Sequence, residues 1–170
     1  MKGSGNKVFF AKEDAGTLDT VTMRHRVAMM QQICQGMEKL AKEGIIHRDL
    51  AARNVLLFHY DPTNPAATSV KVTDFGLSVG ISGCRTHATV QGNQLPDRYL
   101  SPEAIQRRRF SEKSDVWAFG VTMWEILTNG NHPYALVTDS AILAHVFGGG
   151  RLSRPDDCPE DLWSIVQQCW

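Results

Sequence analysis

A polar cluster at residues 47–54, HRDLAARN, stands between two apolar segments of the chain. It places His47, Arg48, Asp49, Arg53 and Asn54 within a few positions of one another. Charged side chains between apolar neighbours are costly unless they are paired, hydrogen-bonded or directed into a cleft. We therefore expect this cluster to line a cleft and to carry chemistry.

A second acidic motif, Asp74-Phe75-Gly76, follows the next apolar run. Gly76 permits a sharp backbone turn that would direct Asp74 toward the first cluster. Two carboxylates and an amide that converge at the ends of strands suit a hard, oxygen-ligated cation such as Mg2+ bridging phosphates. The two motifs together predict a site for phosphate chemistry.

The bulk composition excludes several classes of protein. The chain has 170 residues and 42% hydrophobic content, enough for one globular domain with a core. Its 18 basic and 18 acidic residues cancel, so no overall field favours nucleic acid or an anionic membrane. No apolar run reaches the roughly 20 residues of a membrane span. We expect a soluble chain without nucleic-acid or membrane contact.

The cysteines predict a reducing compartment. They are scattered, and no CxxC pair suggests a zinc site or a disulfide framework. No charged and then apolar leader opens the chain. The prediction is a cytoplasmic protein with free thiols at Cys34, Cys84, Cys158 and Cys169.

The pattern of apolar residues predicts a mainly helical fold with a small β-hairpin. Residues 22–41 carry an apolar stripe at spacings of three and four, and this predicts an amphipathic helix that ends near Gly44. The stripe comprises Val27, Met30, Ile33, Cys34, Met37, Leu40 and Ala41. Residues 55–58 and 70–72 predict two paired strands joined by an exposed, neutral loop, DPTNPAAT.

The C-terminal half predicts three more helices. The run that begins beyond Ser111 has no polar face, so we expect a helix buried all round, with Ser114 or Asp115 at its N-cap. Residues 140–170 predict two further helices separated by GGGRLSRPDDCP. We expect a loop or a short irregular helix at residues 1–19 and a regulated loop at residues 74–101.

The motifs resemble the catalytic domain of eukaryotic protein kinases. HRDLAARN resembles their catalytic loop and Asp74-Phe75-Gly76 their magnesium loop. The resemblance continues through LPDRYLSPEAI, SDVWAFGVTMWEILTNG, Pro133-Tyr134 and the final CPEDLW and CW. It covers residues 20–170 in the order and near the spacing of the family, and it implies a kinase C-terminal lobe.

The resemblance implies a role for each residue of the two motifs. Asp49 would accept or orient the proton of the substrate hydroxyl, and Asn54 and Asp74 would hold Mg2+ ions on ATP. Leu56 would form the floor of the adenine site. His47 would pack beneath Phe75, or be a core histidine without proton chemistry. Arg48 would pair with a phosphate or an acid on the mobile loop.

Two further acids have implied supporting roles. Asp115 would hydrogen-bond the backbone of the catalytic loop, although a plain helix cap is the alternative. Glu103, in the SPE motif, would be a buried carboxylate whose arginine partner lies beyond Trp170 in the family.

The tyrosine-kinase group is the closest resemblance. Its members replace the lysine of serine/threonine kinases with an arginine farther along the loop, here Arg53, and they carry a proline such as Pro96 before the SPE motif. Tyr99 departs from this pattern, because tyrosine kinases usually have tryptophan there. A tyrosine-kinase-like serine/threonine or dual-specificity kinase is therefore the alternative.

The segment between Asp74 and Arg98 contains no tyrosine. A switch based on an activation-loop tyrosine is therefore excluded. The candidate phosphorylation sites are Ser82, Thr86 and Thr89, one of which would pair with Arg48 once phosphorylated. An unmodified polar loop is the alternative.

The spacing before the catalytic loop bears on the domain organisation. KGSGNKVFFAK contains two glycines and a lysine, but Val8 stands where the third glycine of a phosphate-covering loop would be. We expect residues 1–170 to form a partial kinase domain without the ATP-covering lobe and without the end of the C-terminal lobe. The chain would be a fragment of a protein-phosphorylating kinase, or a non-catalytic module that binds a partner kinase or adaptor.

Overall fold

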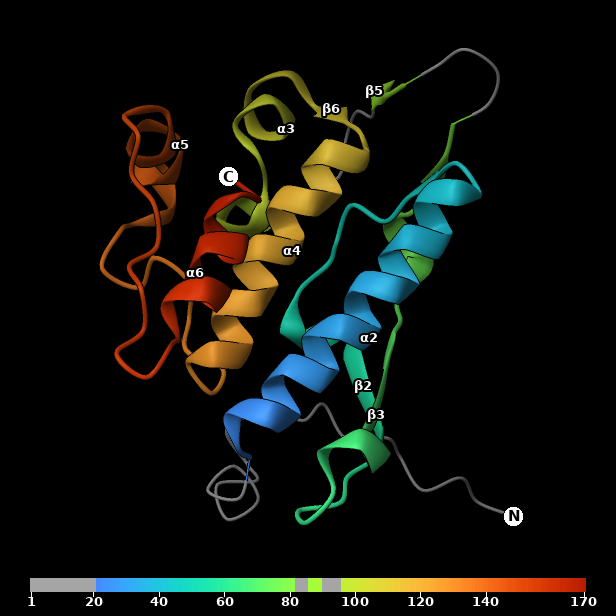
Figure 1. Cartoon of the computed structure of the whole chain (residues 1–170). Helices are drawn as coiled ribbons and strands as arrows, with labels where there is room; N and C mark the ends of the chain where they lie inside the picture. Colours follow the sequence, from blue (N-terminus) through green and yellow to red (C-terminus); the bar gives the residue numbers. More distant parts are fainter. Residues whose placement is uncertain (1–20, 82–85, 90–95) are drawn as a thin grey trace.

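The computed structural model of the protein describes residues 21–81, 86–89 and 96–170, and the loop expected at 1–19 lies outside them. Two long helices, α2 (Met23–Lys42) and α4 (Glu112–Leu127), lie side by side (Figure 1). The shorter helices are α3 (Pro102–Arg107), α5 (Asp139–Phe147) and α6 (Glu160–Gln167). The predictions of the helices from residues 22, 112 and 140 onward are confirmed, whereas α3 was not predicted.

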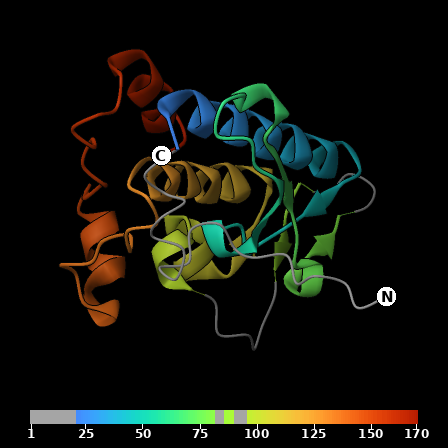
Figure 2. The same cartoon turned by 90° about the horizontal axis from the view of Figure 1, so that it is seen from below.

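Three short antiparallel strand pairs complete the described part of the fold. Strand β2 (Val55–His59) pairs with β3 (Ser69–Val72), which confirms the predicted hairpin. Strand β1 (Ile45–Ile46) pairs with β4 (Val79–Gly80), and β5 (Ala88–Thr89) pairs with β6 (Arg109–Phe110). The β2–β3 hairpin lies along α2, and α5 lies at the opposite side of the molecule (Figure 2).

Helix α2 begins with a capping box of an unusual kind. The backbone N–H of Thr22 donates to Nδ1 of His25 at 3.2 Å, so a histidine takes the place that glutamate commonly has. Lys39 and Lys42 in the last turn complement the negative end of the helix dipole.

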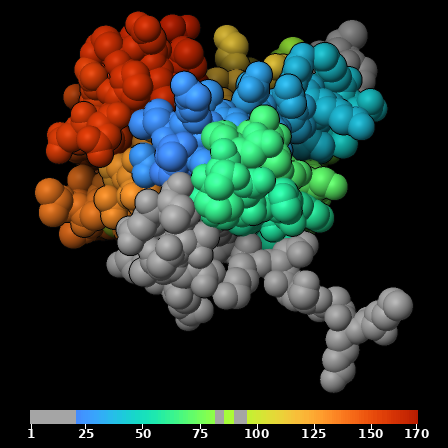
Figure 3. Space-filling model, turned by 60° about the horizontal axis from the view of Figure 1, so that its bottom comes forward, coloured from blue at the N-terminus to red at the C-terminus, as the bar shows by residue number. Residues whose placement is uncertain are grey.

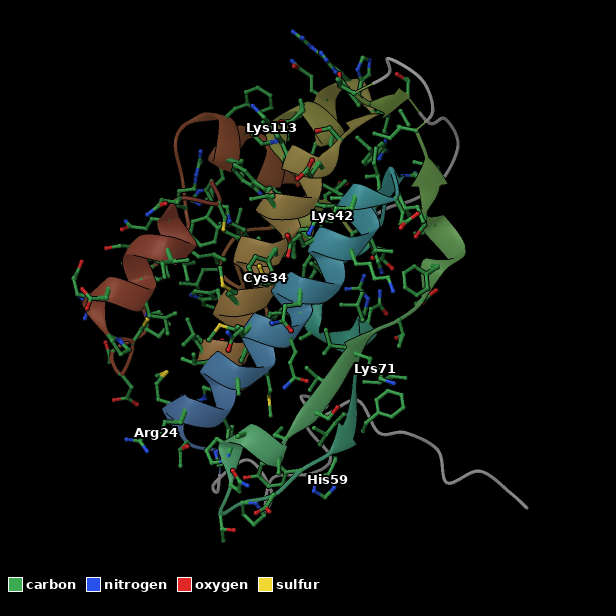
Figure 4. The ribbon with its side chains drawn as sticks, turned by 45° about the vertical axis from the view of Figure 1, so that its right-hand side comes forward. Arg24, Cys34, Lys42, His59, Lys71 and Lys113 are labelled. Atoms are coloured by element: carbon green, nitrogen blue, oxygen red, sulfur yellow. The ribbon has the colours of Figure 1, made fainter. Side chains whose placement is uncertain are left out.

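The predicted apolar stripe of α2 is wrong at two positions. Val27 and Cys34 are exposed, whereas His25 is buried. The reason is that α2 packs against both α4 and the hairpin, so that some apolar residues line surface hollows at its borders. Cys34 lies at the border between α2 and α4, beside Val116 (Figure 4).

The loop between β2 and β3 folds back onto α2 (Figure 3). Nε2 of His25 lies 2.9 Å from the carbonyl oxygen of Asp61. The side chain of Gln32 donates to the carbonyl of Thr68 at 2.8 Å and accepts from the N–H of Val70 at 3.0 Å. The loop is therefore fixed to α2 at both ends, while its middle, at residues 62–64, is exposed as predicted.

The N-cap of α4 is Ser111, which corrects the prediction of Ser114 or Asp115. The Oγ of Ser111 accepts from the N–H of Ser114, and Oγ of Ser114 accepts from the N–H of Ser111 at 2.9 Å. Asp115 therefore lies inside the helix. The prediction that α4 is buried all round is also wrong, because Val116 is 42% exposed.

The core joins α2, α4, α6 and the hairpin and extends beneath the catalytic loop. Met29 and Ile33 of α2 meet Ile126 of α4 in one cluster that also includes Leu50. Ala51 belongs to a second cluster, and neither Leu50 nor Ala51 is exposed to solvent. The apolar half of HRDLAARN thus anchors the polar half to the core.

Candidate active site

The catalytic loop is fixed to α4 by Asp115. Its carboxylate accepts from the backbone N–H of His47 at 2.7 Å and of Arg48 at 3.0 Å. Asp115 is only 6% exposed, and burial raises its carboxyl pKa while the two backbone hydrogen bonds oppose the rise. These bonds hold Arg48 in the left-handed region, with φ of 72°. Asp115 has the contact that the family resemblance implies.

His47 joins the two motifs from beneath. Its Nδ1 accepts from the N–H of Asp49 at 3.2 Å, and its Nε2 donates to the carbonyl of Thr73 at 3.1 Å. The ring lies 5.3 Å from that of Phe75. Both ring nitrogens are thus used in structural hydrogen bonds, and this favours the interpretation of His47 as a core histidine.

Asp49, Arg53 and Asn54 converge in one hydrogen-bonded group. The Oδ1 of Asp49 is paired with Nη2 of Arg53, and its Oδ2 accepts from Nδ2 of Asn54 at 2.9 Å. The same Nδ2 donates to the backbone carbonyl of Asp49 at 2.7 Å. Because both donors act on the carboxylate, its orientation is fixed while it remains 12% exposed. The amide Oδ1 of Asn54 has no hydrogen-bond partner among the described residues.

Asp74 leaves β3 through a left-handed turn. Its φ is 62° and its ψ 70°, and its Oδ1 accepts from the N–H of Gly76 at 3.4 Å. The preceding Thr73 donates its N–H to the carbonyl of Asn54 at 2.9 Å. The two motifs are therefore tied together next to the predicted metal residues Asn54 and Asp74. Phe75 remains 50% exposed.

Arg48 points into the protein. It is 5% exposed, donates from Nη1 to the carbonyl of Leu77 at 2.9 Å, and lies over the ring of Phe110 at 4.4 Å. Burial lowers its pKa, and the nearby charge of Arg108 lowers it further. Of the predicted phosphorylation sites, Thr86 and Thr89 are exposed, and Thr89 pairs across β5–β6 with Arg109. Ser82 lies outside the described residues.

Two further predicted site residues, Leu56 and Glu103, lie on β2 and α3. Leu56 is partly buried on β2, where its strand partner is Lys71 of β3 (Figure 4). Glu103 is partly exposed on α3, and no ion pair joins it to a basic residue of the described chain. The prediction that Glu103 is buried is therefore wrong, because Glu103, in the first turn of the short helix α3, is partly exposed.

Sequence reasoning missed Glu125, which supports the loop from below. This carboxylate accepts from the N–H of Ala52 at 2.9 Å and from the hydroxyl of Tyr99 at 2.7 Å. Burial raises the pKa of Glu125, and burial together with Glu125 raises the pKa of Tyr99. The guanidinium of Arg53 lies 5.1 Å from the Tyr99 ring. A lone glutamate inside an apolar helical run was the available signal.

Arg98 was also missed as a structural residue. Its guanidinium donates to the carbonyls of Pro133, Tyr134 and Val137 and to the carboxylate of Asp139, at 2.6 to 3.0 Å. It holds the segment before α5 against the turn at 97–99. No local sequence pattern predicts such long-range contacts.

The described ranges contain no cluster of three histidine, cysteine or acidic side chains able to hold a metal. A magnesium site here would depend on the amide of Asn54 and the carboxylate of Asp74, with phosphate oxygens completing the shell. No helix in the described part of the chain is long and apolar enough to cross a membrane.

Comparison with known proteins places this site in a family. Residues 7–170 match the family described as protein tyrosine and serine/threonine kinase. The chain is 41% identical over 151 residues to the tyrosine-protein kinase receptor TYRO3 of Danio rerio, covering 89% of this chain and 16% of the relative. It is 38% identical over 173 residues to the proto-oncogene tyrosine-protein kinase ROS of Mus musculus, covering 100% of this chain and 7% of the relative.

A third relative, the human tyrosine-protein kinase ZAP-70, is 35% identical over 158 residues, which cover 91% of this chain and 24% of that protein. The chain thus spans less than a quarter of the length of these curated relatives. It belongs to the protein tyrosine and serine/threonine kinase family, and its fold corresponds to the helical lobe that carries the catalytic loop. The recognition of the tyrosine-kinase group from HRDLAARN is confirmed.

Proposed function

We propose that this chain is the catalytic-loop part of a protein tyrosine kinase, which transfers the γ-phosphate of ATP to tyrosine hydroxyls of proteins. The observation that carries the proposal is the fixed carboxylate of Asp49, held by Arg53 on one oxygen and Asn54 on the other. The relatives named as tyrosine kinases support the same reaction.

Asp49 is the proposed proton acceptor. A hydroxyl that approaches its partly exposed carboxylate would donate to it and be aligned for attack on phosphorus. Arg53 keeps the carboxylate oriented while its own side chain stays 44% exposed at the entrance. In the proposal, Arg53 therefore positions both the acid and the incoming phenol.

The family generally uses ATP with Mg2+, and the residues present fit that group. The Oδ1 of Asn54, which no described residue hydrogen-bonds, and the exposed carboxylate of Asp74 are hard oxygen donors at the junction of the two motifs. Bound Mg2+ would supply neutralisation of phosphate charge. In the proposal Leu56 contacts the adenine, while His47, Phe75, Gly76 and Asp115 maintain the geometry.

Regulation and location complete the proposal. Phosphorylation of Thr86 or Thr89 would add charge beside the exposed Arg109, while Ser82 and the buried Arg48 remain a further candidate pair. Glu103 would have a structural or regulatory role. The described cysteines are free thiols, which supports a cytoplasmic location.

The test is Mg-ATP phosphotransfer to a tyrosine-containing copolymer by the full-length product that contains this chain. Asp49→Asn is expected to lower the rate about a hundredfold or more, because an amide cannot accept the proton. Asp156→Asn is the matched control, since Asp156 is exposed and makes no interaction with the described residues. Equal rates for wild type and Asp49→Asn would overturn the proposal.

The second candidate, a binding module for a partner kinase or adaptor, makes a different prediction. Capture of such a protein by wild type and Asp49→Ala alike, without phosphotransfer, would support it. The polar group around Asp49 would then be a structural feature only.

A further inference from the structure

A hollow of about 500 Å3 lies beside the catalytic loop. Its walls are Arg53, residues 96–99, His132 and Asp139. Arg53 is ion-paired with Asp49, so the hollow continues directly from the proposed proton acceptor. A protein substrate that presents a hydroxyl to Asp49 would therefore place neighbouring residues in this hollow.

Most charged side chains around the hollow already make ion pairs or hydrogen bonds within the protein. A guanidinium has five N–H donors. In Arg98, Nε and Nη2 bind Asp139, Nη1 binds the carbonyls of Pro133 and Tyr134, and Nη2 also binds that of Val137. Four of the five donors are thus in hydrogen bonds, and Nη2 also lies 2.7 Å from Oδ1 of Asp139, so the guanidinium is largely committed within the described chain.

The second arginine of the hollow is also paired. Arg53 binds the carboxylate of Asp49 and lies over the ring of Tyr99. Asp139 is neutralised in turn by Arg98. The basic and acidic members of these two pairs offset one another.

Asp97 is the exception among the charged side chains of the hollow. It begins the turn at 97–99, is partly exposed, and makes no hydrogen bond or ion pair through its side chain with any described residue. Within the described part of the chain, its carboxylate is therefore a negative charge without a paired cation, on the wall where the substrate chain would lie. A cationic side chain would gain attraction there and an anionic one would be repelled.

We propose that Asp97 selects acceptor peptides that carry a lysine or arginine close to the target tyrosine. This inference rests on the proposed function, because it assumes that the peptide enters beside Asp49. It assigns to Asp97 a role in substrate specificity and leaves the proton transfer to Asp49.

The experiment compares peptides that differ at one position. A tyrosine peptide with lysine, alanine or glutamate scanned through the positions flanking tyrosine is phosphorylated by the full-length product at one fixed pH. At one or more positions the lysine peptide is expected to have a kcat/KM about three- to tenfold above the glutamate peptide, carried by KM. The ratio should fall toward one at about 0.5 M NaCl, since salt screens exposed charges.

Matched variants separate the role of Asp97 from general effects. Asp97→Asn should reduce the ratio to near one, and Asp97→Lys should reverse it. Asp156→Asn, which removes an exposed aspartate away from the hollow, should leave it unchanged. A ratio near one in wild type, or the same ratio in Asp97→Asn, would overturn the inference.

Peptide binding distinguishes this inference from the proposed function. Fluorescence anisotropy of the labelled peptides on the same proteins gives the ratio of affinities without any chemistry. Absence of phosphotransfer with a lysine preference that depends on Asp97 would remove the function and keep the subsite. Phosphotransfer without a lysine preference would keep the proposed function and remove the subsite at Asp97. Absence of both phosphotransfer and the lysine preference would overturn the function and the subsite together.

Discussion

The replacement of Asp115 by asparagine is the sharpest test of how the catalytic loop is held. The buried carboxylate accepts two backbone hydrogen bonds, from His47 at 2.7 Å and from Arg48 at 3.0 Å. An asparagine of the same shape has one acceptor oxygen, and its NH2 group would face a backbone N–H donor. One buried N–H would therefore lose its partner.

The magnitude follows from three contributions. A hydrogen bond to a charged group is worth about 1.5–3 kcal/mol, and an unsatisfied buried donor costs about 1–3 kcal/mol. In the other direction, burial raises the pKa of Asp115, so removal of the charge recovers part of the desolvation cost. We expect Asp115→Asn to lower the free energy of unfolding by about 2 kcal/mol.

The strained backbone of Arg48 means that Asp115→Asn should loosen the catalytic loop locally and also lower the stability of the whole fold. A residue other than glycine in the left-handed region costs about 1–3 kcal/mol, and Arg48 has φ of 72°. The bonds to Asp115 offset this cost. Loosening them should therefore release the loop between His47 and Asp49 before the rest of the fold.

Two measurements check this prediction. Urea unfolding of wild type, Asp115→Asn and the control Asp156→Asn gives the global free energies, and hydrogen exchange gives the opening of the amides of His47 and Arg48. The reasoning would be refuted if the free energy of unfolding of Asp115→Asn lay within about 0.5 kcal/mol of the wild-type value and hydrogen exchange at both amides were unchanged.

Three further predictions concern stability. Tyr134→Phe should be neutral or stabilising near pH 7, because the buried Tyr134 hydroxyl has no hydrogen-bond partner among the described residues, whereas Tyr99→Phe should destabilise by about 1–3 kcal/mol because it removes the bond to Glu125. Burial raises the pKa of Tyr134 to about 12 from an ordinary value near 10. The neutral phenol therefore contributes fully to the stability of the fold below pH about 10, and this contribution is lost as the pH rises through 12. At pH 12, Tyr134→Phe should retain about 2 kcal/mol more of its free energy of unfolding than wild type does. Gly44→Ala should destabilise by about 1–3 kcal/mol, because Gly44 has φ of 67° and an added Cβ would lie 2.8 Å from the carbonyl oxygen of Ile81.

Urea denaturation across pH checks all three predictions. Gly80→Ala is the control for Gly44→Ala, since an added Cβ at Gly80 meets no atom within 4 Å. Equal losses in the two alanine variants would contradict the steric argument. Greater destabilisation by Tyr134→Phe than by Tyr99→Phe would contradict the hydrogen-bond argument, and parallel alkaline curves for wild type and Tyr134→Phe would contradict the pKa argument.

Local patterns predicted the parts of the fold that depend on neighbouring residues. An amphipathic stripe identified α2, a long apolar run identified α4, and two short apolar runs identified the β2–β3 hairpin, because these patterns lie in neighbouring residues. The motif HRDLAARN likewise predicted that Asp49, Arg53 and Asn54 act as a group. The structure brings these three side chains into direct hydrogen bonds.

The remaining features depend on partners far apart in the chain. Glu125 meets Ala52 and Tyr99, and Arg98 meets carbonyls more than thirty positions away. A glutamate in an apolar run marks Glu125 as unusual, but no local pattern indicates the partners of either residue. The cap of α4 was misplaced for a different reason. Ser111 and Ser114 are both good capping residues, and only the backbone geometry shows that the helix begins after Ser111.

The identity of the phosphorylated amino acid tests the central claim most directly. A protein substrate is labelled from γ-labelled ATP by the full-length product, with Asp49→Asn as the control, and is then hydrolysed to its phosphoamino acids. We expect phosphotyrosine that is lost in Asp49→Asn. Phosphoserine or phosphothreonine alone would contradict the assignment to tyrosine, and label that persists in Asp49→Asn would contradict the role of Asp49.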